Sequence, residues 1–199
     1  MENKDKIILH LCASEFGSDS LDYKKAGYDV RLITEKIDIR TYEPPTNVYG
    51  IIANPPCTMF SIARGTTAKE PRDLRKGMEL VKECLRIIWQ CQYDMPDQKK
   101  FSPQLKFWYI ENPATGFLKW FLGKPAFVYQ PYEFGGDHSK RTALWGQFNE
   151  PSRLFFNRQL PKGINMKNLH WEERDRKKRT DLRSIAPPEF TKAFYLANP

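Results

Sequence analysis

Two residues of this sequence, Cys57 and Glu111, stand where covalent chemistry on a substrate could be carried out. Cys57 lies in the segment Asn-Pro-Pro-Cys-Thr-Met-Phe-Ser, directly after an apolar run, where two prolines restrict the backbone. A thiol presented by such a loop is a nucleophile once its pKa is lowered. Glu111 follows the apolar run 107–110, and partial burial there would raise its pKa, so that it could donate a proton near neutral pH. Taken singly, either residue could instead be structural, Cys57 in the core and Glu111 in a loop ion pair.

The elements that must position these residues alternate between strand and helix patterns. Short apolar runs predict strands at residues 7–11, 30–33, 48–53, 107–110, 127–132 and 142–145. Helices are predicted at 20–26, ended by Gly27, and at 72–92, where apolar residues recur every three or four positions. This alternation predicts an α/β fold, in which a mostly parallel sheet has helices on both faces.

Reactive or polar residues follow three of the predicted strands. They occur in the turn after Leu11, in the loop 54–61 and at Glu111. In parallel sheets, ligands bind in the crevice beyond the carboxyl ends of the strands. We therefore expect these three segments to converge on one crevice.

Several motifs resemble those of the cytosine-C5 DNA methyltransferases. The catalytic loop of that family, Pro-Cys-x-x-Phe-Ser, matches residues 56–61 in full, and its Glu-Asn-Val motif appears as Glu-Asn-Pro at 111–113. Of a third motif, Gln-x-Arg-x-Arg before a short strand, only Arg141 matches. The closing segment 183–199 is similar to the tail of short phage-type members, so the resemblance covers most of the chain and implies a phage or bacterial setting.

The resemblance implies a catalytic role for three residues. Cys57 would add to C6 of cytosine, Glu111 would hold or protonate N3, and Arg141 would donate to O2. The activated C5 would then take a methyl group from S-adenosylmethionine, on a base that has left the duplex. The further residues that we expect to contact the substrate are Ser61, Asn112, His138, Arg176, Lys177 and Lys178.

The resemblance also implies a Rossmann-like methyltransferase fold with a site for S-adenosylmethionine. The first loop of the family is rich in glycine, because backbone must approach the cofactor closely. The corresponding segment 11–20 holds one glycine and also Glu15, so this loop either binds the cofactor in a different way or does not bind it. The residues expected at the cofactor are Cys12, Ala13, Phe16, Gly17, Glu35, Asp38, Asn54 and Pro55.

The length and the charge of the chain limit its function further. With 199 residues, we expect one domain, 1–199, without a separate target-recognition domain, and hence DNA binding whose sequence specificity is low or supplied by a partner. The net charge is +8, and residues 101–199 hold 16 basic and 9 acidic side chains. The first hundred residues hold 16 basic and 15 acidic side chains, so the excess charge lies in the second half and favours a polyanionic partner.

The sequence shows neither a signal-peptide pattern nor an apolar run of the ~20 residues that span a bilayer. Its four cysteines do not have the spacing of zinc ligands. We therefore expect a cytoplasmic protein with free thiols, no membrane partner and no metal site.

Two other functions compete with DNA methylation. The first is an enzyme that modifies C5 of a free pyrimidine nucleotide through the same thiol addition, which the absence of a recognition domain favours. The second is a non-catalytic nucleic-acid-binding relative, which the glycine-poor first loop favours. The segment 54–57 is also similar to the Asn-Pro-Pro-aromatic motif of amino-methyltransferases, but Cys57 cannot stack on a flipped base as an aromatic residue does.

Overall fold

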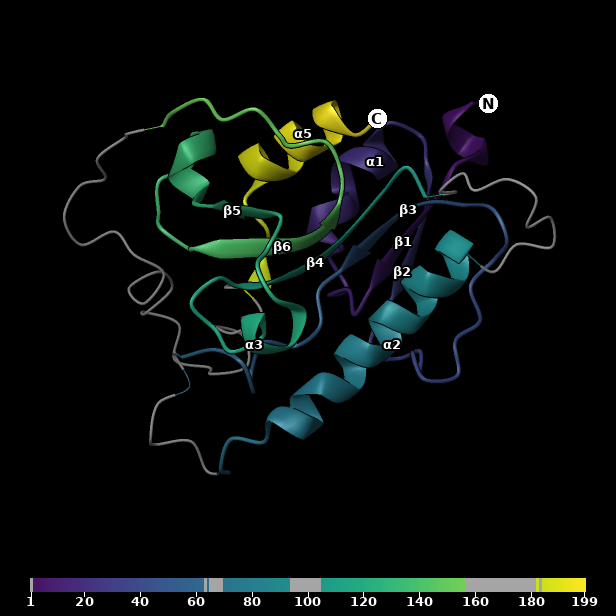
Figure 1. The fold of residues 1–199 in the computed structure, drawn as a ribbon. Coiled ribbons are helices and arrows are strands. Elements are labelled where there is room, and N and C mark those ends of the chain that lie inside the picture. Colours follow the sequence, from purple (N-terminus) through teal and green to yellow (C-terminus); the bar gives the residue numbers. More distant parts are fainter. Residues whose placement is uncertain (1, 63, 65–69, 94–104, 157–181, 183) are drawn as a thin grey trace.

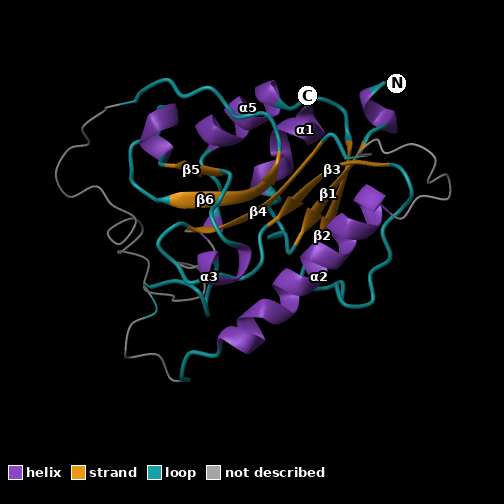
Figure 2. Ribbon diagram, in the orientation of Figure 1, coloured by secondary structure: helices purple, strands orange, loops and turns teal. Residues whose placement is uncertain are grey.

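The computed structural model of the protein describes residues 2–62, 64, 70–93, 105–156, 182 and 184–199. These residues form one six-stranded sheet with helices packed against it (Figures 1 and 2). The strands are β1 (Ile7–Leu11), β2 (Asp29–Ile33), β3 (Val48–Ala53), β4 (Phe107–Pro113), β5 (Phe127–Tyr129) and β6 (Thr142–Gln147).

The helices differ greatly in length. The long ones are α2 (Leu74–Tyr93) and α5 (Pro188–Ala197). The short ones are α1 (Leu21–Lys25), α3 (Lys119–Leu122), and the 3-10 turns η1 (Asn3–Asp5), η2 (Ser18–Ser20) and η3 (Pro131–Phe134). Within the described ranges, none of the helices is both long enough and apolar enough to cross a bilayer.

The sheet is mixed rather than mostly parallel. Its strand order is β2-β1-β3-β4-β6-β5, and the first three of the five neighbouring pairs are parallel. The remaining two pairs are antiparallel, because β6 runs against both β4 and β5. The α/β class is thus confirmed, and the parallel arrangement holds only for the β2-β1-β3-β4 part.

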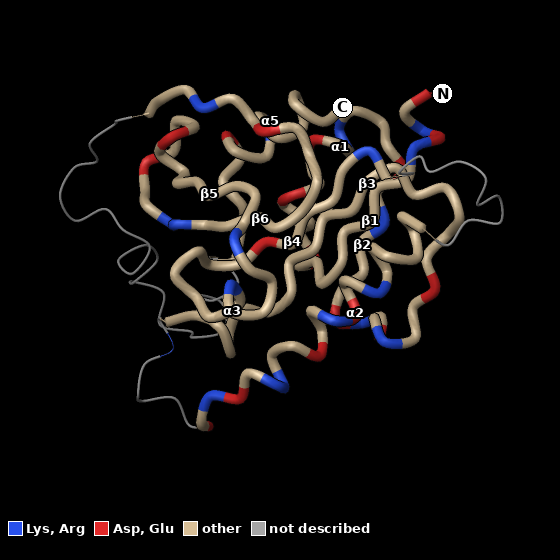
Figure 3. The backbone as a smooth tube through the Cα atoms, viewed as in Figure 1, with Lys and Arg blue, Asp and Glu red and all other residues tan. Residues whose placement is uncertain are grey.

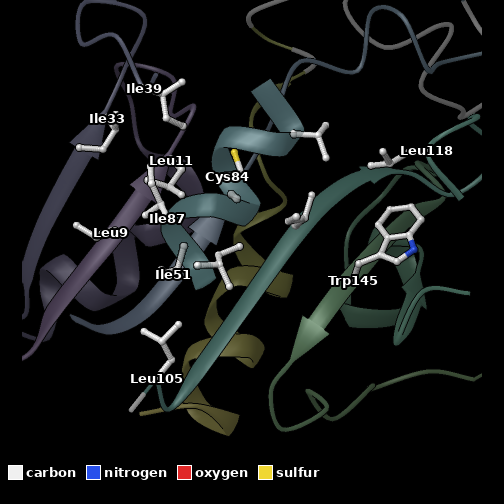
Figure 4. Close-up of a cluster of buried hydrophobic side chains, with 14 of the residues drawn as sticks. Leu9, Leu11, Ile33, Ile39, Ile51, Cys84, Ile87, Leu105, Leu118 and Trp145 are labelled. Carbon is white, nitrogen blue, oxygen red and sulfur yellow. The ribbon is translucent and has the colours of Figure 1, made fainter. Parts of the chain in front are cut away.

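Each face of the sheet buries its own hydrophobic cluster, as expected for helices on both faces. On one face, α2 packs Val81, Cys84 and Ile87 against residues of β1 and β3 (Figure 4). The other face is aromatic, and α5 contributes Phe190 and Phe194 to it. The ring of Phe194 lies 4.9 Å from that of Tyr109 on β4, so the end of the chain is part of the core.

One strand boundary differs from the prediction at a candidate site residue. The sequence pattern ended the strand at Ile110, whereas β4 continues to Pro113. The reason is β6, which pairs with the end of β4 so that Glu111 lies opposite Leu144. Glu111 therefore projects from a strand rather than from a loop, which limits the motion of its side chain.

Other boundaries also differ from the predicted ones, most clearly those of β5 and α1. The strand predicted at 127–132 ends at Tyr129, because Pro131 begins η3 and cannot donate to the sheet. The helix predicted at 20–26 is a 3-10 turn followed by α1. It ends as predicted at Gly27, whose φ of 85° is in the left-handed region that favours glycine.

Candidate functional site

The loop that carries Cys57 is held by hydrogen bonds on both sides of the thiol. Before the cysteine, the buried Asn112 amide on β4 donates to the carbonyl oxygen of Pro55 at 3.0 Å. After it, the amide groups of Phe60 and Ser61 both donate to the Cys57 carbonyl oxygen, at 2.9 and 2.7 Å. The Glu-Asn-Pro and Pro-Cys segments, far apart in the sequence, are thus joined directly.

The electrostatic setting of Cys57 keeps its thiol protonated in the resting protein. The residue is exposed on the loop, yet the protein atoms around the sulfur exclude enough water to raise the pKa of the Cys57 thiol. The charge of Glu111 raises this pKa further, and Lys140 lowers it. A substrate would therefore have to bind before the thiolate forms in quantity.

Glu111 is the second titratable group of this site. Its side chain is 16% exposed, and burial raises the pKa of the Glu111 carboxyl above its usual value. Lys140 opposes this shift in pKa, with its Nζ 3.9 Å from Glu111 Oε1. The predicted raised pKa of Glu111 is confirmed in direction, and Lys140 is a charge at this site that sequence reasoning missed.

Asn54 connects the carboxylate to the loop after β1. Its side chain acts on Glu111 to lower the pKa of that carboxyl, and its Nδ2 donates to Asp19 Oδ1 at 3.4 Å. Its Oδ1 lies 2.9 Å from Nε2 of His10. The Tyr109 hydroxyl also donates to Asp19. We call these five residues the His10–Glu111 network.

His10 brings an imidazole ring into the network from β1, and the residue is 1% exposed. Desolvation lowers the pKa of His10, so the ring is neutral at pH 7. The Nε2–H then donates to Asn54 Oδ1, while Nδ1 accepts from the Ser20 hydroxyl at 2.9 Å when that hydroxyl turns from its other acceptor, the Gly17 carbonyl at 3.1 Å. Both ring nitrogens are therefore satisfied, as a buried polar group requires.

Replacing His10 by glutamine is expected to lower the free energy of unfolding at pH 8 by about 1–3 kcal/mol, because buried partners lose hydrogen bonds. The loss should shrink as the pH falls below about 6.5, the usual value for histidine. In this range the unfolded wild-type chain takes up a proton that folded His10, with its lowered pKa, does not, so wild-type stability declines with falling pH.

Chemical denaturation of both proteins between pH 8 and pH 5 measures this difference. Ile8→Val, which shortens a fully buried apolar side chain on the same strand, is the control, and its deficit of about 1 kcal/mol should not depend on pH. A deficit of His10→Gln that is equally constant would contradict a neutral, buried His10.

A cleft of about 970 Å³ lies beyond the carboxyl ends of β1, β2 and β3. Its walls include Cys12, which directly follows β1, and Asn54 and Pro56 from the loop after β3. These strands are neighbours in the sheet, but the chain passes from β1 to β2 on one side before it returns to β3 on the other. Such a reversal is where open α/β sheets bind ligands.

Most of the residues predicted at the cofactor line this cleft. They are Cys12, Ala13, Phe16, Glu35, Asp38 and Asn54. Gly17 and Pro55 are not among the lining residues, because Gly17 packs against Leu32 and the Pro55 carbonyl is turned to Asn112. The charge of Glu15 at the cleft is offset by Lys36, whose Nζ is 2.5 Å from Glu15 Oε1.

The expected convergence of three strand ends is confirmed only for two. The loops after β1 and β3 line the cleft, whereas Cys57 and Glu111 do not. Glu111 is related to the cleft through Asn54, which lines the cleft and lowers the pKa of the Glu111 carboxyl. The two halves of the candidate site are therefore a cleft and an adjoining reactive pair.

The remaining predicted site residues have different settings. Arg141 has an exposed side chain, and its carbonyl oxygen accepts from the Ala114 amide beside the end of β4. His138 is bonded to Asp137 through Nδ1 at 3.0 Å. The Ser61 carbonyl accepts from Arg72 at 3.0 Å. The other three predicted substrate-binding residues lie outside the part of the chain that the structure describes: Arg176, Lys177 and Lys178.

In sequence comparisons, no protein-family model matches the chain, and no curated protein matches it either.

Proposed function

We propose that this protein is a cytosine-C5 methyltransferase that acts on DNA and uses S-adenosylmethionine. The observation that carries the proposal is the hydrogen bond from Asn112 to the Pro55 carbonyl, which fastens the Cys57 loop to the strand that bears Glu111. This bond supports the proposal because it ties the loop of the proposed nucleophile to the strand of the proposed proton donor, and thiol addition to a pyrimidine requires the two groups close together. The influence of Glu111 on the pKa of the Cys57 thiol is a sign of this proximity.

The cleft supports a nucleoside-type cofactor beside this pair. A volume of about 970 Å³ is in the range of small-molecule sites, and the walls combine apolar residues with carboxylates. Glu35 and Asp38 can accept hydrogen bonds from the ribose hydroxyls and the adenine amino group, and Ile37 and Ile39 add apolar side chains to the same wall. We infer that the sheet and the cleft at its reversal form a Rossmann-like methyltransferase fold.

The cofactor would supply an electrophilic methyl group. In the proposed reaction, the Cys57 thiolate forms a bond to C6 of cytosine, and the displaced electron pair makes C5 nucleophilic. Glu111 donates its proton to N3 as this charge develops, and Arg141 donates a hydrogen bond to O2. C5 would take the methyl group as the bond of that group to the sulfonium sulfur breaks, which leaves S-adenosylhomocysteine. A base would then remove the C5 proton, the S–C6 bond would break to release the Cys57 thiolate, and the N3 proton would return to Glu111.

The experiment that tests the proposal follows a labelled methyl group. The protein is incubated with labelled S-adenosylmethionine and either cytosine-containing duplex DNA or dCMP, and label at C5 is measured. We expect label in DNA. Label in dCMP alone would assign the chain to free nucleotides. Absence of label in both, together with no heat of cofactor binding in calorimetry, would refute both enzymatic functions.

A further inference from the structure

The short helix α3 carries two aromatic side chains that face solvent. Trp120 is 66% exposed and Phe121 is 47% exposed, although large aromatic residues are buried on average in folded proteins. The helix lies below β4 and β6 in the view of Figure 1. We call the surface formed by Trp120 and Phe121 the α3 platform.

The α3 platform is attached directly to the Cys57 loop. The amide of Phe117, just before α3, donates to the Phe60 carbonyl at 2.9 Å, and the rings of Phe60 and Phe121 are 6.3 Å apart. A side chain on Gly116 would approach the Phe60 carbonyl to 3.0 Å, so this contact is close. The platform is therefore attached to the loop at Phe60, three residues after the candidate nucleophile Cys57.

The ring of Trp120 is supported from the protein side. Its centroid is 4.5 Å from that of Phe117, and the Arg72 guanidinium lies over the Phe117 ring at 4.6 Å. The same Arg72 bonds to the Ser61 carbonyl of the Cys57 loop. An exposed ring that is fixed in this way loses little freedom when a flat ligand stacks on it.

The charges of the chain segment that carries the platform suit a polyanion. Lys119 and Lys124 flank the two aromatic residues, and both are exposed. From Asn112 to Tyr132 the chain contains these two lysines and no acidic residue. By contrast, α2 carries charges of both signs between Arg75 and Arg86 (Figure 3). Basic side chains beside exposed rings are the combination that holds single strands of nucleic acid.

We propose that the α3 platform stacks unpaired bases of the DNA strand next to the target cytosine, with Lys119 and Lys124 on the phosphates. The inference rests on the proposed function, since a base that leaves the duplex leaves unstacked neighbours. Trp120 would lower the free energy of that opened state by covering their faces.

Binding of DNA in the absence of cofactor tests this inference, because no methyl transfer then occurs. A labelled single-stranded oligonucleotide and the corresponding duplex are titrated with the whole protein, and binding is followed by fluorescence anisotropy. We expect Trp120→Ala to raise the Kd for the single strand by about 5- to 150-fold, and Trp120→Phe to change it by less than about threefold. The effect on the intact duplex should be smaller.

Trp89 provides the matched control, because it is 63% exposed on α2 and the Trp89→Ala variant removes an equally large ring. Its affinity for DNA should equal that of the wild type. Lys119→Ala and Lys124→Ala should each reduce the salt dependence of single-strand binding by about 0.7 in the slope of log K against log salt. Equal Kd values for Trp120→Ala and wild type, or equal losses for single strand and duplex, would overturn the inference.

The methyl-transfer assay separates this inference from the proposed function. Binding of single strands that depends on Trp120, with no methyl transfer to DNA, supports single-strand binding by the α3 platform and refutes the proposed function. Methyl transfer to DNA by a protein whose Trp120→Ala variant binds like the wild type supports the function and refutes the platform.

Discussion

Replacement of Cys57 by serine should lower kcat for methyl transfer to cytosine by at least about 10⁴-fold, because the step that activates C5 needs the sulfur nucleophile. Cofactor binding should be unchanged, since Cys57 does not line the cleft. Stability should also change little, because the residue is exposed on its loop. The rate of methyl incorporation, measured with saturating DNA, gives the comparison.

A covalent adduct gives a second, more direct readout of the same residue. DNA that contains 5-fluorocytosine cannot lose the substituent at C5, so the intermediate should accumulate and appear by mass spectrometry on the peptide with Cys57. Cys91→Ser is the matched control: Cys91 is half-buried on α2, burial raises the pKa of its thiol to about 12, and its loss should leave adduct and rate unchanged.

The rate at which the Cys57 thiol is alkylated at different pH values gives a further test. Because the pKa of the Cys57 thiol is raised, a small alkylating reagent should modify the resting protein slowly at pH 7 and faster as the pH increases. Full activity of Cys57→Ser, or an adduct on another cysteine, would contradict nucleophilic catalysis by Cys57.

Much of the fold could be predicted because the pattern of each element is local. The apolar runs at Ile7–Leu11 and Val48–Ala53 coincide with β1 and β3, and the helical spacing at 72–92 identified α2. The direction of β6 could not be predicted in this way, because an antiparallel return depends on a connection and on partners distant in sequence. The same distant pairing extended β4 past Ile110.

Candidate site residues were predictable where their type and neighbours were unusual, as at Cys57 between prolines and aromatic residues. The His10–Glu111 network could not be predicted, because His10 occurs inside an apolar run that by itself predicts only a buried strand. The histidine itself is a signal, since a polar residue in a buried strand needs a hydrogen-bond partner for each polar atom. The partners, Ser20 and Asn54, follow from the fold and could not be read from spacing.

The second large effect concerns Glu111. Glu111→Gln should lower kcat by about 10²–10⁴-fold, because the amide can donate a hydrogen bond to N3 but cannot transfer a proton as charge develops there. DNA binding should be near wild type, since the carboxylate contributes to the chemistry rather than to phosphate contacts. Glu150→Gln, which changes an exposed glutamate, should leave the rate unchanged and serves as the control.

The raised pKa of Glu111 gives this prediction a signature in pH. In the wild type, kcat/KM should fall as the pH rises through the pKa of Glu111, where the acid form is lost, and formation of the Cys57 thiolate should raise it toward alkaline pH. The Glu111→Gln variant should retain only the dependence that arises from Cys57.

Stability provides a readout that does not depend on catalysis. Because the pKa of Glu111 is higher in the folded protein than its ordinary value of 4.5, the folded state binds more protons between these two values. The free energy of unfolding of the wild type, relative to Glu111→Gln, should therefore decrease as the pH rises through this window, since ionisation places a charge in a buried site. If the difference in free energy of unfolding between the two proteins is constant with pH, the pKa of Glu111 is the same in the folded and unfolded chain. The carboxyl could then not serve as the proton donor near neutral pH.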